Sequence, residues 1–491
     1  HGARIYRRSL TFLLAKAVQD LFPDAFFAVE HSLGTGYYCR FEHADQSGLS
    51  KQEFDALEAH LRKLVESNIA IQRKNVSFEE AYRALERENQ TDKLNLLRYR
   101  NPPRITMWRC EDFSDAGQGV LAPYTRCLDG FTLIDHDPGF VLQFPAWNEE
   151  SRAMEMPEYE RQPHLFEIFQ EHKRWGEIIG IRTVGDLNEA VASHKLDDLV
   201  KTSEALHEKK LSLIADQIAG RKEKIRWVFI AGPSSAGKTT FSRRLAVHMR
   251  VNGLHPVTIE CDNYFVNREH TPLDDEGKPD FEHIDAIDHD LFNDHLGKLH
   301  RGEEIELPAF NFQTGRQEFP GETLRLEEDQ VVIIEGIHCL DPVMSRGIPR
   351  EHAFYIYISA LTQLTLDKNN RLSTTDLRLI RRIIRDNRTR GHSALRTFEL
   401  WPSVRRGEKR WIFPFQRLAD VAFNSSLDYE FAVLKPFVSP LLAEIKPFHD
   451  EYAEARRLID FLEMIITAPA GPVPLSSIVR EFIGESSYHS G

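Results

Sequence analysis

The stretch that decides the fold reads Gly232-Pro233-Ser234-Ser235-Ala236-Gly237-Lys238-Thr239-Thr240. It follows the apolar run 227–231 and leads into residues 241–245, so the pattern G-x-x-x-x-G-K-T stands between a predicted strand and a predicted helix. The glycines let successive backbone N–H groups point inward at a phosphate, and the helix N-terminus adds positive potential. The sequence therefore predicts a nucleoside triphosphate site, with ATP as the expected cofactor. The predicted nucleotide-binding residues are Gly232, Ser234, Ser235, Ala236, Gly237, Lys238, Thr239 and Thr240.

Three side chains in or near this loop suit a bound triphosphate. Lys238 can reach the β- and γ-phosphates, and the hydroxyl of Thr239 can hold Mg²⁺. Glu335 follows the apolar run 331–334, where it can position Mg²⁺ directly or through water. The expected metal residues are therefore Thr239 and Glu335.

Composition bounds the class of protein. The 491 residues carry a formal net charge of −13, which does not favour a broad nucleic-acid surface, although a local basic patch stays open. The five cysteines are scattered without a C-x-x-C pair, as in a protein of a reducing compartment. No apolar run approaches the roughly 18 residues of a membrane span, and no secretory signal is visible. We expect a cytoplasmic protein without a membrane partner. The chain begins at His1 without Met, as a fragment of a longer protein would.

The chain divides into four parts by pattern. Residues 1–150 show mixed helical and strand spacing, and residues 151–222 form a charged, largely helical bridge. Residues 223–440 alternate strand-like runs at 227–231, 257–261, 331–334 and 353–358 with helical stretches, and residues 441–491 form a helical extension. The alternation predicts an α/β fold with a parallel sheet and helices on both faces.

Two further features lie where this sheet would bind a ligand, at the carboxyl ends of its strands. Asp262 follows the run 257–261 and could accept the proton of an acceptor hydroxyl. Residues 371–410 hold twelve Lys or Arg against four Asp or Glu. A solvated basic helix or an RNA-binding face would explain that segment, but guanidinium groups suit phosphate, so a lid that closes over the triphosphate fits better.

Ordered blocks from 226 to 430 resemble the uridine kinase and phosphoribulokinase family of P-loop kinases. These blocks are the loop itself, Asp262-Asn263-Tyr264-Phe265, Phe281-Glu282-His283-Ile284-Asp285-Ala286, Glu335-Gly336-Ile337-His338, an arginine-rich stretch at 376–391, Ala419-Asp420 and Asn424-Ser425-Ser426. The resemblance implies that Asp262 is the catalytic base, that Asp285 holds a ribose, and that Arg382, Arg385 and Arg390 contact phosphates. The expected catalytic residues are Lys238, Asp262, Arg382, Arg385 and Arg390, and the expected substrate-binding residues are Asp262, Tyr264, Asp285 and Phe310.

The chain departs from uridine kinases in one block. Their P-x-Y-D-F motif is followed by a His, and its Tyr and His read the pyrimidine, whereas this chain has Pro308-Ala309-Phe310-Asn311-Phe312-Gln313-Thr314-Gly315. Phe310 can stack but lacks the hydroxyl, and Gly315 stands where the His is expected. A site without these hydrogen-bonding groups loses the discrimination they supply. The base that would be accepted, and whether the acceptor is a nucleoside, stay open.

Residues 1–147 resemble, more weakly, the editing domain of threonyl-tRNA synthetases. The similar stretches are 21–25, 34–41 and 123–126. The editing chemistry of that family uses an H-x-x-x-H pair on the first helix, but residues 10–17 contain no His. We therefore expect an α+β fold without the hydrolase site, and regulation, dimerisation, or binding of a small molecule or RNA all stay open.

The leading hypothesis is an ATP- and Mg²⁺-dependent nucleoside kinase that acts on a ribose 5′-hydroxyl. A phosphoribulokinase-like sugar kinase is the enzyme alternative. An RNA-binding, translation-linked protein switched by the triphosphate is the non-catalytic alternative, and the charge of −13 argues against it. The expected partner is a small-molecule substrate, while tRNA and a homo-oligomer are left open.

Overall fold

The computed structural model describes residues 2–43, 48–117, 119–148, 151–159, 161, 163–274 and 276–488, with the backbone alone at 163–165 and 167. The chain divides into two compact units. The first unit comprises His1–Leu196, Thr362–Ser373 and Arg457–Ala468. The second unit comprises Asp197–Leu361, Thr374–Arg456 and Pro469–Gly491. Each unit thus contains segments far apart in the sequence, and the four-part division drawn from the sequence stays a prediction.

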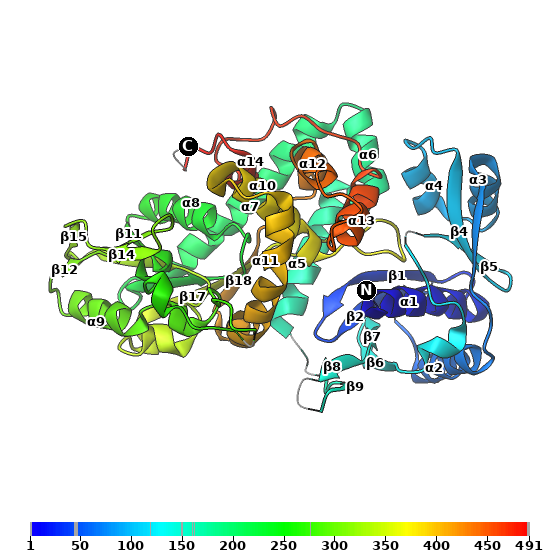
Figure 1. Cartoon of the computed structure of the whole chain (residues 1–491), viewed down its shortest axis with the longest axis horizontal. Coiled ribbons are helices and arrows are strands. Elements are labelled where there is room, and N and C mark those ends of the chain that lie inside the picture. Colours follow the sequence, from blue (N-terminus) through cyan, green and yellow to red (C-terminus); the bar gives the residue numbers. More distant parts are fainter. Residues whose placement is uncertain are drawn as a thin grey trace. The chain divides into compact units, whose positions relative to one another are not determined.

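The first unit is an α+β structure built on an antiparallel sheet with strand order β1-β2-β7-β6 (Figure 1). The strands of this sheet are β1 (Phe26–Leu33), β2 (Gly36–Glu42), β6 (Thr132–His136) and β7 (Gly139–Gln143). The smaller sheets contain β3 (Gln72–Ser77), β4 (Arg104–Cys110) and β5 (Phe113–Ala116), and β8 (Ala146–Asn148) with β9 (Ala153–Glu155). The helices are α1 (Gly2–Leu21), α2 (Lys51–Glu66), α3 (Phe78–Arg87), α4 (Thr91–Leu97), α5 (Pro163–Ile179) and α6 (Val184–Ala192).

Helix α1 forms because its apolar residues recur at helical spacing, which puts Leu10, Leu13, Leu14 and Ala17 on a buried face. These side chains pack in one core cluster with strands β1 and β2 and with helix α2. Helix α2 begins at a capping box, in which the Ser50 side chain accepts the N–H of Glu53 and the Glu53 carboxylate accepts the N–H of Ser50.

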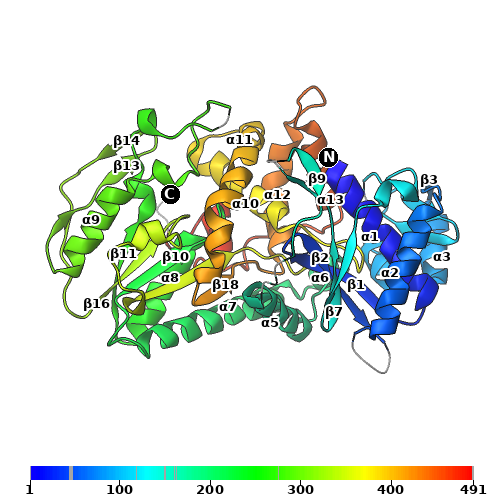
Figure 2. The same ribbon diagram turned by 90° about the horizontal axis from the view of Figure 1, so that it is seen from below.

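The second unit is built on a five-stranded sheet with order β11-β16-β10-β17-β18 and parallel pairing throughout. The strands are β10 (Trp227–Ala231), β11 (His255–Glu260), β16 (Gln330–Glu335), β17 (Ala353–Ser359) and β18 (Val421–Asn424). Figure 2 shows β10, β11 and β16 close together beside α8. The four strand runs predicted from the sequence are confirmed.

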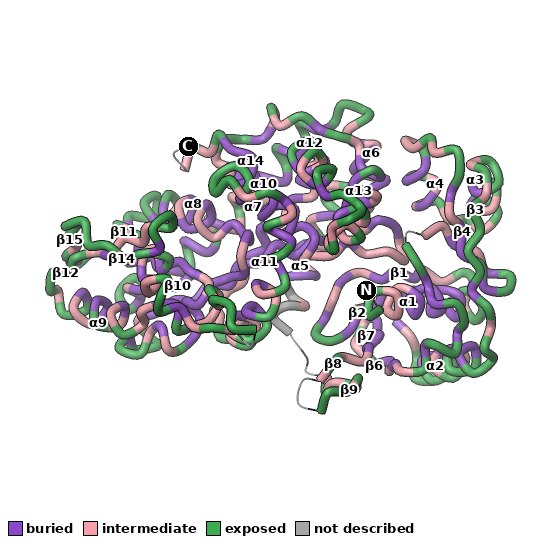
Figure 3. Tube along the Cα trace, viewed as in Figure 1, coloured by how far each residue is buried: buried purple, intermediate pink, exposed green. Residues whose placement is uncertain are grey.

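Helices cover both faces of this sheet, because alternate residues of a strand point to opposite faces. Val228 and Ile230 of β10 pack with residues of α7 (Leu196–Ala219), α8 (Lys238–Val251) and α14 (Ile478–Ile483). Trp227 and Phe229 pack on the other face with α9 (His289–His300). All five residues of β10 are buried, and Figure 3 shows this central trace as buried. The α/β class and the parallel sheet predicted from the sequence are confirmed.

The remaining helices of the second unit follow the sheet strands. They are α10 (Thr374–Arg390), α11 (Ala394–Gly407) and α12 (Glu430–Ala443). Helix α13 (Tyr452–Leu462) is divided, because its residues up to Arg456 belong to the second unit and those from Arg457 belong to the first. Two short hairpins lie between α9 and β16, namely β12 (Ile305–Glu306) with β15 (Thr323–Leu324) and β13 (Ala309–Asn311) with β14 (Arg316–Glu318). Within the described residues, no helix combines the length and apolar character that a membrane crossing needs.

Candidate active site

The phosphate-binding loop joins β10 to α8 in a conformation that two glycines make accessible. A Cβ on Gly232 would lie 2.2 Å from the carbonyl oxygen of Ile358, so the loop leaves the strand against the backbone of β17. Gly237 has a φ of 84°, in the left-handed region, and Ser235 also has a positive φ of 61°. Lys238 is the first residue of α8, so the loop ends at a helix N-terminus, as predicted.

Thr239 and Glu335 lie side by side although 96 positions separate them. The Thr239 hydroxyl donates to Oε1 of Glu335 at 2.7 Å. The parallel register explains this contact: Glu335 pairs with Ile230 on β10 and with Glu260 on β11, so the carboxyl ends of the three strands align. Burial raises the pKa of Glu335 to about 7, against the opposing effect of Lys238. Near pH 7, half of the molecules therefore carry a protonated Glu335 carboxyl, unless a bound cation neutralises its charge.

These two oxygens fit the predicted Mg²⁺ ligands. Mg²⁺ takes oxygen ligands and is commonly held by one or two carboxylates together with substrate phosphates. The Thr239 hydroxyl donates to the buried Glu335 carboxyl, and burial raises the pKa of that carboxyl despite the nearby Lys238. Among the described residues, no group of three or more His, Cys, Asp and Glu side chains forms a site that would hold a metal by protein ligands alone. Thr239 and Glu335 would thus hold Mg²⁺ only together with phosphate oxygens.

Helix α10 brings the predicted lid arginines to the loop. Nη1 of Arg382 donates to the Ser234 hydroxyl at 2.8 Å. Arg382, Arg385 and Arg390 surround the buried carboxylate of Asp386, at 3.2, 3.1 and 3.3 Å. Burial disfavours the charge of Asp386, yet these guanidinium groups hold its pKa below the usual value. One carboxylate therefore keeps three arginines together beside the loop.

Arg390 carries more positive charge around it than Asp386 can neutralise. Partial desolvation and the neighbouring Arg385 lower the pKa of Arg390, although its side chain is 41% exposed and Asp386 and Asp262 favour the charged form. A guanidinium in such surroundings gains stability from an added anion. The three arginines therefore form an electropositive cluster suited to phosphate.

Two other arginines of α10 have structural partners that the sequence did not reveal. Arg378 and Arg381 are fully buried and form ion pairs with Glu408 and Glu430 respectively. Arg378 also donates to the carbonyl oxygen of Ser234 at 3.1 Å, and Arg381 donates to that of Ser235 at 3.4 Å. The two guanidinium groups thus bind backbone carbonyl oxygens of the loop.

Asp262, the predicted base, is exposed on a short 3₁₀ helix (Cys261–Tyr264) directly after β11. Its charge acts on both Glu335 and Arg390, so the acid lies among the loop, the metal residues and the lid. Asp285 is also exposed, and its carboxylate lies 3.1 Å from Nε2 of His289. Both carboxylates are available to a substrate from solvent.

Phe310 and Tyr264 are placed differently. Phe310 is half-buried on β13 in an aromatic cluster, with ring centroids 5.5 Å from Phe265 and 5.1 Å from Phe312. Tyr264 is only 1% exposed, and its hydroxyl is 3.0 Å from Nδ1 of His295 on α9. The structure thus gives Tyr264 a packing role in the core, and its role in substrate binding stays a prediction.

Residues 308–315, where the chain departs from uridine kinases, comprise β13 and the hairpin turn that leads to β14. Oδ1 of Asn311 accepts the N–H groups of Gln313 and Thr314, and the carbonyl oxygen of Gly315 accepts the N–H of Arg268 at 2.8 Å. The polar group of Asn311 is therefore used within the turn. The part of the hairpin nearest Phe265 presents aromatic faces.

Sequence reasoning gave no role to two buried groups beside the loop. Burial raises the pKa of Glu282 to about 7, with Arg382 and Lys238 opposing the rise, and its Oε2 has no hydrogen-bond partner among the described residues. Burial lowers the pKa of His338 to about 3, so this imidazole is neutral. Both residues stand in the quoted blocks, but only their tertiary position shows that they are buried near Lys238.

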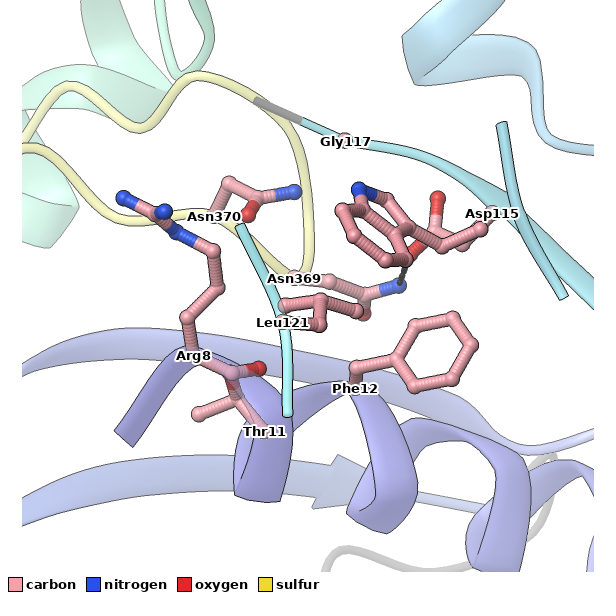
Figure 4. A pocket seen from close by; sticks show the side chains of 9 residues that line it. Arg8, Thr11, Phe12, Asp115, Gly117, Leu121, Asn369 and Asn370 are labelled. Carbon is pink, nitrogen blue, oxygen red and sulfur yellow. Dashed lines mark hydrogen bonds between the residues drawn. The ribbon is translucent and has the colours of Figure 1, made fainter. Parts of the chain in front are cut away.

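The first unit contains a separate small pocket of about 20 Å³, partly open to solvent (Figure 4). Its lining residues are Arg8, Thr11, Phe12, Trp108, Asp115, Gly117, Leu121, Asn369 and Asn370. Asn369 donates to Asp115 at 3.4 Å, and Asp115 also pairs with the buried Lys93. Asn369 and Asn370 belong to the segment 362–373, and Lys368 of that segment donates its N–H to Asp92 at 2.8 Å. These contacts fasten the segment within the first unit.

The family match covers most of the sheet-containing part of the second unit and also residues 362–373 of the first. The model of the Phosphoribulokinase / Uridine kinase family matches residues 228–431. The uridine kinase of Bacillus pumilus is 31% identical over 193 residues, which are 39% of this chain and 82% of that protein. The uridine kinase of Chloroflexus aurantiacus is 32% identical over 196 residues, 40% of this chain and 84% of that protein. The chain belongs to the phosphoribulokinase and uridine kinase family.

This membership confirms the resemblance inferred from the motif blocks. A solved structure of a possible uridine kinase from Bacillus stearothermophilus is 18% identical, covers 44% of this chain and 98% of that one, and has a TM-score of 0.31. The family match begins at residue 228, so the resemblance of residues 1–147 to an editing domain stays a prediction. Burial raises the pKa of Cys110 in that region to about 11, which leaves its thiol uncharged.

Proposed function

We propose that the protein transfers the γ-phosphoryl group of ATP to a hydroxyl of a small molecule, and that this acceptor is the 5′-hydroxyl of a nucleoside. The observation that carries the proposal is the pairing of Thr239 with Glu335 at 2.7 Å beside Lys238, with Arg382 held on the same loop at 2.8 Å from Ser234. Oxygen ligands, an ammonium group and guanidinium groups thus meet at one glycine-rich loop, as phosphoryl transfer requires.

Each group of residues has its own proposed role in phosphoryl transfer. N–H groups of residues 232–240 receive the phosphates, and Lys238, Arg382, Arg385 and Arg390 stabilise the negative charge of the transferred group. Mg²⁺ held by Thr239 and Glu335 would supply further charge neutralisation. The Asp262 carboxylate accepts the proton of the acceptor hydroxyl, whose oxygen bonds to the γ-phosphorus as the bond to the ADP oxygen breaks.

The acceptor side favours an aromatic ring over a bare sugar. Phe310, Phe265 and Phe312 offer apolar faces on which a base can stack. Asn311 is engaged within its turn, so the hairpin supplies little hydrogen-bond discrimination among bases. We infer a nucleoside kinase with a broad base preference and a ribose held by Asp285.

The test is ATP consumption by the purified protein with Mg²⁺ over a panel of nucleosides, sugars and sugar phosphates, with product masses read by mass spectrometry. Nucleoside monophosphate formed from several bases supports the proposal. A phosphorylated sugar product with no nucleotide product replaces it with a sugar kinase. ATP bound without any turnover, together with salt-dependent binding of tRNA, supports the nucleotide-switched RNA binder instead.

A further inference from the structure

The C-terminal segment, residues 469–488, lies outside the family match and packs against the phosphate-binding loop within the second unit. Its helix α14 places Ile478 so close that a Cβ on Gly237 would lie 2.5 Å from Cγ2 of Ile478. Ile478 and Phe482 are buried in the core cluster that contains Phe241 of α8. The segment is therefore a built part of the surroundings of the loop.

Glu481 of this helix occupies donors at the end of the loop. Its Oε2 accepts the backbone N–H of Thr240 at 3.2 Å and the Thr240 hydroxyl at 2.8 Å. In a loop of this kind, the backbone N–H groups are the donors that cradle the α- and β-phosphates. A carboxylate and a phosphate are both acceptor-only anions, so they compete for the same donors.

The same helix also engages the lid. Arg388 donates from Nη2 to the carbonyl oxygen of Glu481 at 3.0 Å and from Nε to that of Phe482 at 3.2 Å. The guanidinium of Arg381 lies over the ring of Phe482, 5.0 Å from its centroid. Displacement of α14 would thus release a donor of the loop and a guanidinium of α10 together.

The segment is also held together by bonds of its own. The buried Arg480 donates to the carbonyl oxygens of Val473 and Ala470, and its Nη1 pairs with Glu485 at 2.8 Å. These bonds join residues 470–485 to each other and not to the loop. Glu481 faces the loop, whereas Glu485 is a largely exposed carboxylate of the same segment.

We propose that Glu481 makes an autoinhibitory contact, in which the C-terminal segment competes with a triphosphate for the phosphate-binding loop. The proposal rests on the triphosphate binding of the proposed function. Occupation of the loop by a triphosphate displaces the Glu481 carboxylate from Thr240 and frees Arg388.

The first experiment compares the binding of ATP and of inorganic tripolyphosphate, each with Mg²⁺, to the wild type, Glu481→Gln, Glu481→Ala and the matched control Glu328→Gln, an exposed glutamate outside the segment. Loss of a charged acceptor should tighten binding by roughly five-fold in Glu481→Gln and roughly ten-fold in Glu481→Ala. Glu328→Gln should bind as the wild type does. Unchanged or weaker binding in both Glu481 variants overturns the proposal.

A second experiment measures amide hydrogen exchange of residues 478–483 in the wild-type protein, because it does not depend on any variant folding. ATP or tripolyphosphate should reduce their protection, and retained protection at saturating ligand overturns the proposal. Tripolyphosphate separates the two hypotheses because it carries no nucleoside. If Glu481→Gln binds tripolyphosphate more tightly but no nucleoside is phosphorylated, the proposed acceptor is wrong and the autoinhibitory contact of Glu481 is supported. If neither the wild type nor any variant binds ATP or tripolyphosphate, both the proposed function and the autoinhibitory contact are wrong.

Discussion

The two units each bury charged side chains, but they use them in different ways. In the first unit, Lys93 and Asp115 are paired and buried, and Nδ2 of Asn370 donates to Asp367 at 2.9 Å. In the second unit, Glu335 has the Thr239 hydroxyl as its neighbour, and three arginines share Asp386. The first cluster pairs its charges within the protein, whereas the second leaves positive charge in excess beside a glycine-rich loop.

The difference teaches which buried charges mark a binding site. Carboxylates at Asp115, Asp367 and Asp92 hold the pKa of Lys93 above its ordinary value although burial opposes it. Burial raises the pKa of Asp367 to about 7, with Asp115 and Asp92 adding to the rise and Lys93 opposing it. A perturbed pKa therefore occurs in both units. It indicates a binding site only where several hydrogen-bond donors also face the perturbed group.

The largest effect should come from Lys238→Ala, which removes the ammonium group from the loop. We expect phosphoryl transfer to fall by about 10³- to 10⁵-fold, because this cation stabilises charge only in the transition state and on bound phosphate. Circular dichroism and melting temperature should stay close to wild type. Activity within ten-fold of wild type would remove Lys238 from the mechanism.

Asp262→Asn should lower kcat by about 10²- to 10⁴-fold, since the amide cannot accept the proton of the acceptor hydroxyl. The binding of ATP should change little, which an ATP titration without acceptor measures. Asp290→Asn, a neutralised carboxylate exposed on α9, is the matched control and should retain the wild-type rate. Equal rates in Asp262→Asn and the control would contradict the role of a base.

Lys93→Met tests the first unit, where the charges are expected to serve stability alone. It leaves buried carboxylates without their cation, so we expect a loss of about 3–5 kcal/mol of unfolding free energy. Chemical denaturation gives this value, and hydrogen exchange on β4 and α4 assigns it to the first unit. Lys51→Met, which removes an exposed ion pair with Asp55, should leave the unfolding free energy close to that of the wild type. An ATP affinity that falls with Lys93→Met would break the distinction between the two clusters.

Glu335→Gln should separate stability from function in the second unit. A carboxyl whose folded pKa is about 7 keeps its proton on folding, so its contribution to stability falls as pH rises from about 4.5 through 7. The variant has no such loss, so its free energy of unfolding should exceed that of the wild type by up to about 3 kcal/mol at pH 8, with no advantage at pH 4.

Melting curves of Glu335→Gln and wild type at pH 5 and pH 8, without nucleotide, measure this difference. Glu260→Gln, on the paired position of β11, is the control. An advantage of Glu335→Gln that does not grow between pH 5 and pH 8 would show that burial does not penalise this carboxylate. Phosphoryl transfer should fall in Glu335→Gln at every pH, because the metal loses a charged ligand.

Most of the second unit could be predicted from the sequence because its signals are local. The strand runs before the loop and before Glu335 read as continuous apolar stretches, which is typical of strands buried on both faces. The run before Asp262 includes Thr258 and Glu260, and its strand β11 is only partly buried. The meeting of Thr239 and Glu335 followed from strand topology, since parallel strands bring their carboxyl ends together.

The roles within the arginine helix could not be predicted in this way. From the sequence, Arg378 and Arg381 are equivalent to Arg382 and Arg385, yet the first two are neutralised by Glu408 and Glu430. Those partners lie 30 and 49 positions away, and no periodicity relates them to the helix. Tyr264 likewise stands in a motif beside the proposed base Asp262 but points to His295 in the core.

The sequence by itself determined the phosphate-binding loop, the parallel sheet, the family and the candidate acid, because each depends on residues adjacent in the chain or on the regular geometry of strands. Only the tertiary structure decided which arginines face the loop, that residues 362–373 belong with the first unit, and that Glu481 reaches Thr240 from 241 positions away. Such contacts arise from packing between distant segments, and the local pattern of either segment carries no record of its partner.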